Sequence, residues 1–245
     1  MSKLAKINTL LLCLGLFLAG CGGNGESLEE GTIPVESSDP GGLTQAAVEK
    51  QKIGAFEEAV EILNRALAMD ANFGPAHYRM GAVYEEWDKR REAAAAYKKA
   101  LAIDPANVEA RLGLGSVYSK LSRNNLAVEE YKKVAEARPD DPEIPFKIAL
   151  EYWFIQKLPE TAEHYLKVIE IDPDHMQAHL NLASVYERMK EWDKAVEQID
   201  IALRMGKEKG NVQAISIAES KLAFIKGRMN MSEKEMDRKT QPPFE

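Results

Sequence analysis

Apolar positions in this chain recur at the spacing of α-helices. The segment FKIALEYWFI, residues 146–155, is apolar on two sides when it is read at 3.6 residues per turn. The two stripes lie about 100° apart and consist of Ile148, Ala149, Tyr152 and Ile155 on one side and Phe146, Leu150 and Trp153 on the other. A helix at a protein surface needs one such stripe to pack against its neighbours. The second stripe therefore requires its own interpretation.

The same pattern returns every 34 residues from Gly42 onward. Small residues recur at this step as Ala47, Gly81, Gly115, Ala149 and Ala183, and again as Ala59, Ala93, Ala127, Thr161 and Ala195. Aromatic residues follow the same step as Tyr84, Tyr118, Tyr152 and Tyr186. Three of the units end at Pro105, Pro139 and Pro173. The chain therefore divides into five units, which we number one to five: 40–73, 74–107, 108–141, 142–175 and 176–209.

Each unit has the pattern of a helical hairpin. In unit two the first helix carries Gly81 and Tyr84 on one face, and the second helix carries Ala93 and Tyr97 at the same kind of spacing. Small residues let two helices approach closely, and aromatic rings fill the space beside them. A proline after the second helix ends it and turns the chain into the next unit.

This repeat resembles the tetratricopeptide repeat family across residues 40–209. The resemblance implies an all-α fold, a right-handed superhelical solenoid of five helical hairpins. Residues 211–226 show apolar positions at helical spacing and predict a capping helix over the last hairpin, so that the solenoid spans 42–227. The terminal units depart from the pattern at Lys50, Ala71 and Lys207, as expected for the ends of a solenoid.

The chain begins with the pattern of an export signal over residues 1–20. Lys3 and Lys6 precede an apolar run, and Leu18-Ala19-Gly20-Cys21 resembles the lipobox of bacterial lipoproteins. The resemblance implies that the signal is cut before Cys21, that the thiol of Cys21 carries a covalent lipid such as palmitate, and that lipid anchors the protein to a membrane. Polar residues 21–41 then predict a flexible tether, and 228–245 predict a disordered tail. An ordinary cleaved signal, giving a soluble secreted protein, is the alternative.

Composition narrows the classes of partner. The formal net charge is −7 and the pI is about 5.4, which argues against nucleic-acid binding. Removal of the signal would leave Cys21 as the one cysteine, so no internal disulfide is expected. We expect no small-molecule substrate and no cofactor other than the lipid on Cys21. The resemblance to the tetratricopeptide repeat family implies that the partner is a protein or peptide.

In the tetratricopeptide family the first helices line the concave side, where partners bind. The resemblance therefore places the second stripe in a groove, and the predicted partner-binding residues are Tyr78, Leu112, Phe146, Leu150, Trp153 and Leu180. Charged residues predicted for the rim are Glu85, Glu86, Lys120, Glu187 and Arg188. The alternative is that these side chains pack between neighbouring first helices, or that the chain's own tail or a second copy covers them.

Motifs for catalysis are missing from the sequence. It contains no Gly-rich phosphate loop, no serine in a nucleophile elbow and no cysteine paired with a histidine. His175 and His179 are four residues apart, with Asp172 and Asp174 nearby, which is one spacing used for metal ligands. His179, however, stands where unit two has His77, and this recurrence indicates packing. We therefore predict neither catalytic nor metal-binding residues, and a metal-dependent enzyme stays as the minor alternative.

These features together predict a membrane-anchored adaptor of the bacterial cell envelope. Gly22 follows the predicted lipidated cysteine, which resembles lipoproteins sorted to the outer membrane, facing the periplasm. The order of signal, lipobox and repeats is similar to that of pilotin lipoproteins, which assist assembly of pilus or secretion complexes. Other lipoproteins with this order scaffold peptidoglycan enzymes or outer-membrane assembly.

Overall fold

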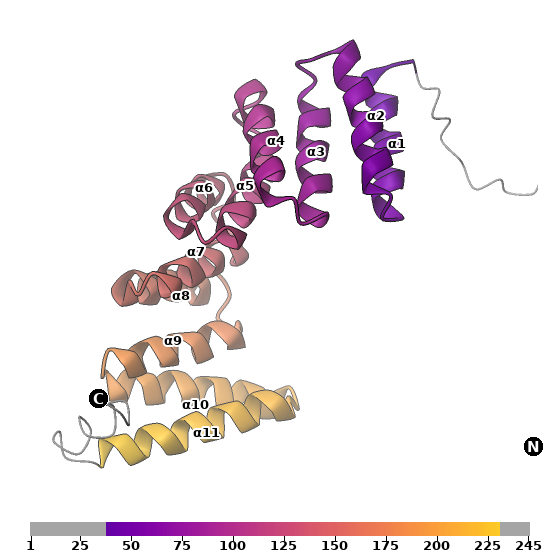
Figure 1. Cartoon of the computed structure of the whole chain (residues 1–245). Coiled ribbons are helices and arrows are strands. Elements are labelled where there is room, and N and C mark those ends of the chain that lie inside the picture. The colour runs from indigo at the N-terminus through magenta and orange to yellow at the C-terminus, as the bar shows by residue number, and fades with distance from the viewer. Residues whose placement is uncertain (1–37, 231–245) are drawn as a thin grey trace, which may run out of the picture. The chain divides into compact units, whose positions relative to one another are not determined.

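The computed structural model describes residues 38–230, and every regular element in this part of the chain is a helix (Figure 1). The predicted signal peptide, Cys21, most of the tether and residues 231–245 lie outside the described residues. The eleven helices are α1 (Pro40–Lys52), α2 (Phe56–Met69), α3 (Gly74–Glu86), α4 (Arg90–Ile103), α5 (Val108–Lys120), α6 (Asn124–Ala137), α7 (Glu143–Phe154), α8 (Leu158–Ile171), α9 (Met176–Arg188), α10 (Trp192–Glu208) and α11 (Val212–Met229).

Consecutive helices pack against each other in chain order, as Figure 1 shows. Each of the five units contributes one hairpin, from α1 with α2 to α9 with α10, and α11 packs on α10. The solenoid of five hairpins with a C-terminal helix, predicted from the 34-residue step, is therefore confirmed. None of the helices within residues 38–230 combines the length and apolar character needed to cross a bilayer.

Both ends of the helical array differ slightly from the expected boundaries. Helix α1 begins at Pro40, so the last two residues of the predicted tether are helical. The carboxylate of Asp39 accepts a hydrogen bond from the Gly42 N–H at 2.9 Å, which caps the helix, and Pro40 has the fixed φ that suits a first turn. At the other end, α11 continues to Met229, past the predicted end of the capping helix.

In units two and three, tyrosine rings lie directly on glycine residues of the first helices. A Cβ atom on Gly81 would come within 2.6 Å of the Tyr97 ring, and one on Gly113 within 2.5 Å of the same ring. Gly81 belongs to the same hairpin as Tyr97 and Gly113 to the next, so one ring joins two units. Gly115 and Tyr131 repeat the first contact one unit later, with a Cβ atom at 2.6 Å.

The turn inside every hairpin contains one residue with a left-handed backbone. These residues have φ between 57° and 75° and follow the 34-residue step as Gly54, Asp88, Ser122, Gln156 and Lys190. Only the first is glycine, the residue that adopts this conformation without steric cost. Four turns therefore hold an L side chain where the backbone disfavours one.

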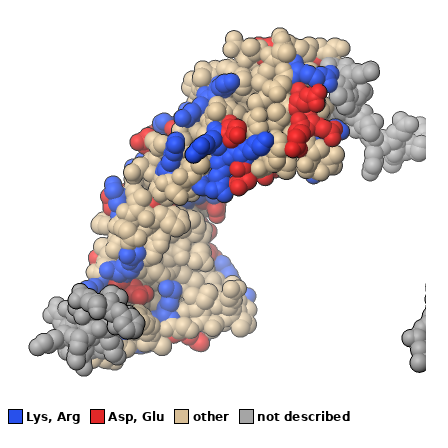
Figure 2. Space-filling view, viewed as in Figure 1, with Lys and Arg blue, Asp and Glu red and all other residues tan. Residues whose placement is uncertain are grey.

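Charged side chains of both signs are spread over the outside of the helices. Figure 2 shows Lys and Arg interspersed with Asp and Glu along the row, with a group of acidic side chains over α1 and α2. Many of them are paired, such as Lys50 with Glu58 at 2.7 Å and Lys167 with Glu163 at 2.7 Å. Exposed pairs of this kind contribute little to stability, typically well under 1 kcal/mol each.

Replacing Gly54 by alanine is expected to lower the free energy of unfolding by about 1 kcal/mol. The added Cβ meets nothing within 4 Å, so the cost comes from φ of +75° alone. Replacing Gly227, which lies inside α11 and is also open, should raise the free energy by roughly 0.5–1 kcal/mol. Urea unfolding of the two variants measures both changes, and changes of the same sign would contradict the conformational explanation.

Candidate functional site

The first helices of the units present one face on which the second stripe lies. We call the side of α3, α5, α7 and α9 that carries these residues the first-helix face. Tyr78, Leu112 and Phe146 are half-buried there. Leu180, which was predicted to join them, is only 4% exposed. It packs in the same cluster as Ala218 and Ile225 of α11, so it offers no surface to a partner and the prediction for Leu180 is wrong.

Aromatic contacts surround Phe146 in unit four. Its ring meets the Tyr165 ring edge to face at 5.5 Å between centroids, and it stacks on His175 at 5.1 Å. Trp153 lies further along α7, and the guanidinium of Arg188 in α9 lies 4.8 Å from the centroid of its ring. Phe146 and Trp153 thus pack on neighbouring helices and still keep part of their surface open. The stripe therefore has features of both interpretations, internal packing and a surface for a partner.

A small pocket lies beside this cluster. It has a volume of about 160 Å³ and is lined by Leu150, Trp153, Tyr165, Asn181 and Ser184. We call it the unit-four pocket. Its walls come from α7, α8 and α9, and they are apolar on the α7 side and polar on the α9 side. A single side chain of a partner matches its size and its mixed character.

The polar wall of the unit-four pocket is held by hydrogen bonds. Asn181 Nδ2 donates to the Tyr165 hydroxyl at 3.0 Å, and Asn181 Oδ1 accepts from Gln177 at 2.8 Å. Ser184 accepts from Lys221 of α11 at 2.8 Å. Burial raises the pKa of Tyr165 to about 12, so its hydroxyl keeps its hydrogen at neutral pH. Within residues 38–230 no acceptor takes that hydrogen, which leaves it available to a ligand.

A polar network occupies the first-helix face of units two and three. Both oxygens of Glu85 are used: one accepts from the Tyr97 hydroxyl at 2.9 Å, and the other accepts from Ser116 Oγ and Lys120 Nζ, each at 2.7 Å. Burial, and next the charge of Glu85, raise the pKa of Tyr97. The network joins α3, α4 and α5, so this part of the face is set by internal contacts.

The other residues predicted for the rim lie at the edge of the first-helix face. Glu86 and Arg188 are exposed, and Glu187 is half-buried. Besides its contact with Trp153, Arg188 donates a hydrogen bond to the Gln156 side chain in the turn of unit four. Arg188 therefore ties unit five to unit four beside the unit-four pocket.

The sequence reasoning missed Glu151, a buried acid in α7. It stands in the series Val83, Val117, Glu151 and Val185, and it is 3% exposed. Its carboxylate accepts a hydrogen bond from Asn124 Nδ2 at 2.7 Å, which links α7 to the start of α6. Reading the valine series at the 34-residue step would have revealed it. Burial, followed by the charge of Glu151, raises the pKa of Tyr131.

The two histidines considered as metal ligands have structural partners. His175 Nδ1 accepts from the Ala178 N–H at 3.2 Å and caps α9. His179 has both ring nitrogens occupied, by the Pro173 carbonyl at 3.2 Å and the Gln198 side chain at 2.7 Å. Across residues 38–230 no group of three or more His, Cys, Asp or Glu side chains is arranged to hold a metal ion.

Comparison with protein families supports the repeat. Residues 88–144 match one model of the tetratricopeptide repeat, and residues 164–197 match a second model with the same description. The two matches fall in units two to five. A comparison with curated proteins gave no match.

Solved structures with the same fold cover most of the chain. YrrB, a tetratricopeptide repeat protein, has a TM-score of 0.64 and 25% sequence identity, over 74% of this chain and 92% of its own. A crystal structure of MamA has a TM-score of 0.66 and 21% identity, over 71% of this chain and 95% of its own. MamA residues 41 to the end from Desulfovibrio magneticus RS-1 has a TM-score of 0.64 and 20% identity, over 72% and 99%. These similarities identify the fold as a tetratricopeptide repeat solenoid.

Replacing Glu85 by alanine is expected to lower the free energy of unfolding by about 1–3 kcal/mol, because three donors lose their acceptor. Glu86 is adjacent and exposed, so Glu86→Ala should change stability by less than about 0.5 kcal/mol. Thermal and urea unfolding of the two variants compare them directly. Equal effects would show that the Glu85 network does not stabilise the solenoid.

Proposed function

We propose that this tetratricopeptide repeat solenoid is an adaptor that binds a protein or peptide segment on its first-helix face. The observation that carries the proposal is the unit-four pocket, with Leu150 and Trp153 on its apolar side and Asn181 and Ser184 on its polar side. An apolar side chain of the partner enters the pocket as an anchor. Deep pockets that take one aromatic or aliphatic anchor carry much of the affinity in such interfaces.

The similar structures support this class of function. YrrB is a tetratricopeptide repeat protein with an unusual peptide-binding site, and its similarity covers 74% of the present chain. The resemblance to tetratricopeptide repeat proteins supports a role in holding other polypeptides. The partner segment lies along the first helices, where half-buried Tyr78, Leu112 and Phe146 add contact area to the anchor.

The polar wall of the pocket suggests how the backbone of the partner is oriented. The Tyr165 hydroxyl hydrogen is free to donate to a carbonyl, and Arg188 lies at the edge with its guanidinium over Trp153. Hydrogen bonds to a peptide backbone fix direction, and the apolar anchor provides most of the binding energy. A short extended or helical segment with one large apolar residue fits this arrangement.

We also propose that lipid on Cys21 holds the adaptor at a bacterial membrane. Lys3, Lys6, the apolar run and the box Leu18-Ala19-Gly20-Cys21 support it. The net charge of −7 argues against attachment to anionic lipids by charge, whereas more than one acyl chain gives stable anchoring. With Gly22 after the cysteine, the solenoid faces the periplasm from the outer membrane. Assistance in assembling a pilus or secretion complex, as by a pilotin, is the specific role within this proposal.

Partner capture tests the binding face. Crosslinking in cells, followed by purification and mass spectrometry, should recover a specific partner with the wild-type protein and roughly tenfold less of it with a Leu150→Ala, Trp153→Ala variant. Leu166 of α8 is 46% exposed and does not line the pocket, so Leu166→Ala is the matched control and should retain the partner. An identical set of partners for all three proteins would exclude the unit-four pocket as the binding site.

The anchor has an independent test. The wild-type protein should fractionate with membranes, and its mature N-terminal peptide should begin at Cys21 and carry the mass of attached acyl chains. Cys21→Ser removes the thiol that accepts lipid, so this variant should lose membrane association. A mature N-terminus without lipid would instead support the soluble secreted alternative, and it would leave the proposal for the unit-four pocket intact.

A further inference from the structure

Two of the five hairpins, those of units three and five, hold a pair of polar residues at equivalent positions. In unit three, Arg111 of the first helix donates to Glu130 of the second helix at 2.9 Å. In unit five, the corresponding residues His179 and Gln198 are 2.7 Å apart. Both pairs are nineteen residues apart, and both fill the space between the two helices of their hairpin.

Unit four lacks this pair, as do unit one, with Leu43 and Ile62, and unit two, with His77 and Ala96. In unit four the corresponding positions hold Pro145, which has no polar side chain, and His164. His164 is only 7% exposed, and its Nδ1 atom has no hydrogen-bond partner within the described residues. A buried polar atom without a partner costs free energy. Neither Pro145 nor any other described residue satisfies this nitrogen.

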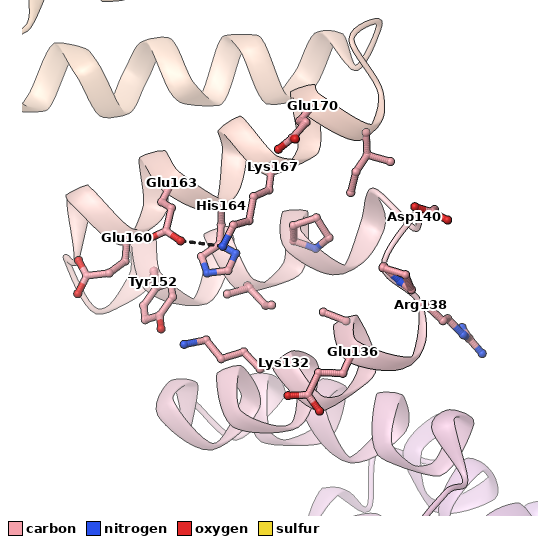
Figure 3. A pocket seen from close by; sticks show the side chains of 15 residues that line it. Lys132, Glu136, Arg138, Asp140, Tyr152, Glu160, Glu163, His164, Lys167 and Glu170 are labelled. Carbon is pink, nitrogen blue, oxygen red and sulfur yellow. Dashed lines mark hydrogen bonds and ion pairs between the residues drawn. The ribbon is translucent and has the colours of Figure 1, made fainter.

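A cleft lies beside Pro145 and His164 (Figure 3). It has a volume of about 1020 Å³ and runs between α6, the following loop, the start of α7 and α8. Its apolar lining includes Pro139, Pro145, Ile148, Tyr152 and Ile171, and the His164 ring forms part of the wall. No residue lines both this cleft and the unit-four pocket, because the two use different stripes of α7.

Acidic side chains without partners surround the cleft. Glu136 of α6, Asp140 of the loop and Glu170 of α8 make no ion pair or hydrogen bond to other described residues through their carboxylates. Figure 3 shows them on different sides of the opening.

The other charges at the rim are mostly occupied. Lys167 pairs with Glu163 at 2.7 Å, Arg138 pairs with Glu109 outside the cleft, and Glu160 lies 3.6 Å from Lys157. Lys132 is the one lining cation without a carboxylate partner among the described residues, and its ammonium lies 5.5 Å from the centroid of the Tyr152 ring. The available charge is therefore three carboxylates against one ammonium, which favours a cationic ligand.

His164 does not oppose such a ligand. Burial lowers the pKa of its imidazole to about 4, so the ring is neutral at the pH at which the carboxylates are charged. A neutral imidazole has one nitrogen that donates and one that accepts. The ring therefore adds no positive charge to the wall of the cleft.

We propose that this cleft is a second binding site, which takes a lysine or arginine side chain of a partner polypeptide. The aliphatic part of that side chain lies on Pro139 and Ile171, and its charge lies among Glu136, Asp140 and Glu170. The volume exceeds that of a free amine and suits a side chain together with several residues of backbone. The adaptor then contacts polypeptides on two sides of α7.

The repeat itself supplies the test variant. A Pro145→Arg, His164→Glu double variant rebuilds in unit four the ion pair of Arg111 and Glu130, and it fills the cleft. The probe is a fluorescent, acetylated pentapeptide with a central arginine flanked by leucines, titrated against the purified full chain by anisotropy. We expect binding to the wild type and about tenfold weaker binding to the double variant. The double variant should unfold at the wild-type temperature or above.

Charge variants keep the test valid if the double variant does not fold. Glu136→Gln with Glu170→Gln should weaken binding of the arginine peptide, whereas Glu129→Gln, an exposed acid of α6 outside the cleft, should not. A peptide with norleucine in place of arginine should bind at least tenfold more weakly. Equal binding of the norleucine peptide, equal binding to the double variant, or equal affinity for free agmatine would each overturn the proposal. The Leu150→Ala, Trp153→Ala variant should bind the arginine peptide normally.

Discussion

The packing of units two and three depends on the close approach of helices at positions without a side chain. The Tyr97 ring lies on Gly81 of its own hairpin and on Gly113 of the next, at distances that a Cβ atom would not permit. One ring thereby determines both the spacing inside a unit and the spacing between units. Because this contact recurs with Gly115 and Tyr131, the first-helix face and the cleft of unit four are both built on a regular frame.

The regular part of this frame could be predicted from the sequence, because each unit repeats its residue classes at one step. The positions at which the units differ could not be predicted from the pattern of a single helix. Leu180 has the spacing of a surface residue, but it is buried in an apolar cluster formed by several helices. Three residues of unit four become informative only when they are compared with their equivalents in other units. Glu151 stands where other units have valine, and Pro145 and His164 stand where units three and five have a hydrogen-bonded pair.

Helix α7 explains why unit four differs from its neighbours. It is apolar on two stripes: Leu150 and Trp153 are half-buried on the first-helix face, whereas Pro145 and Ile148 are buried at the base of the cleft beside α8. Proline at position 145 is compatible with the helix because the N–H groups of a first turn have no intrahelical acceptor. The residue that removes a polar pair therefore leaves the helix itself undisturbed.

Pro145 is a local irregularity in an otherwise regular array of repeats. Each unit of a solenoid contacts only its neighbours, so stability is close to a sum of local contributions. A substitution that removes a side chain from one unit changes the surface of that unit and leaves distant units as they were. Such an array can acquire a new recognition site by a single replacement. The same replacement in another unit would place the same kind of site at that unit.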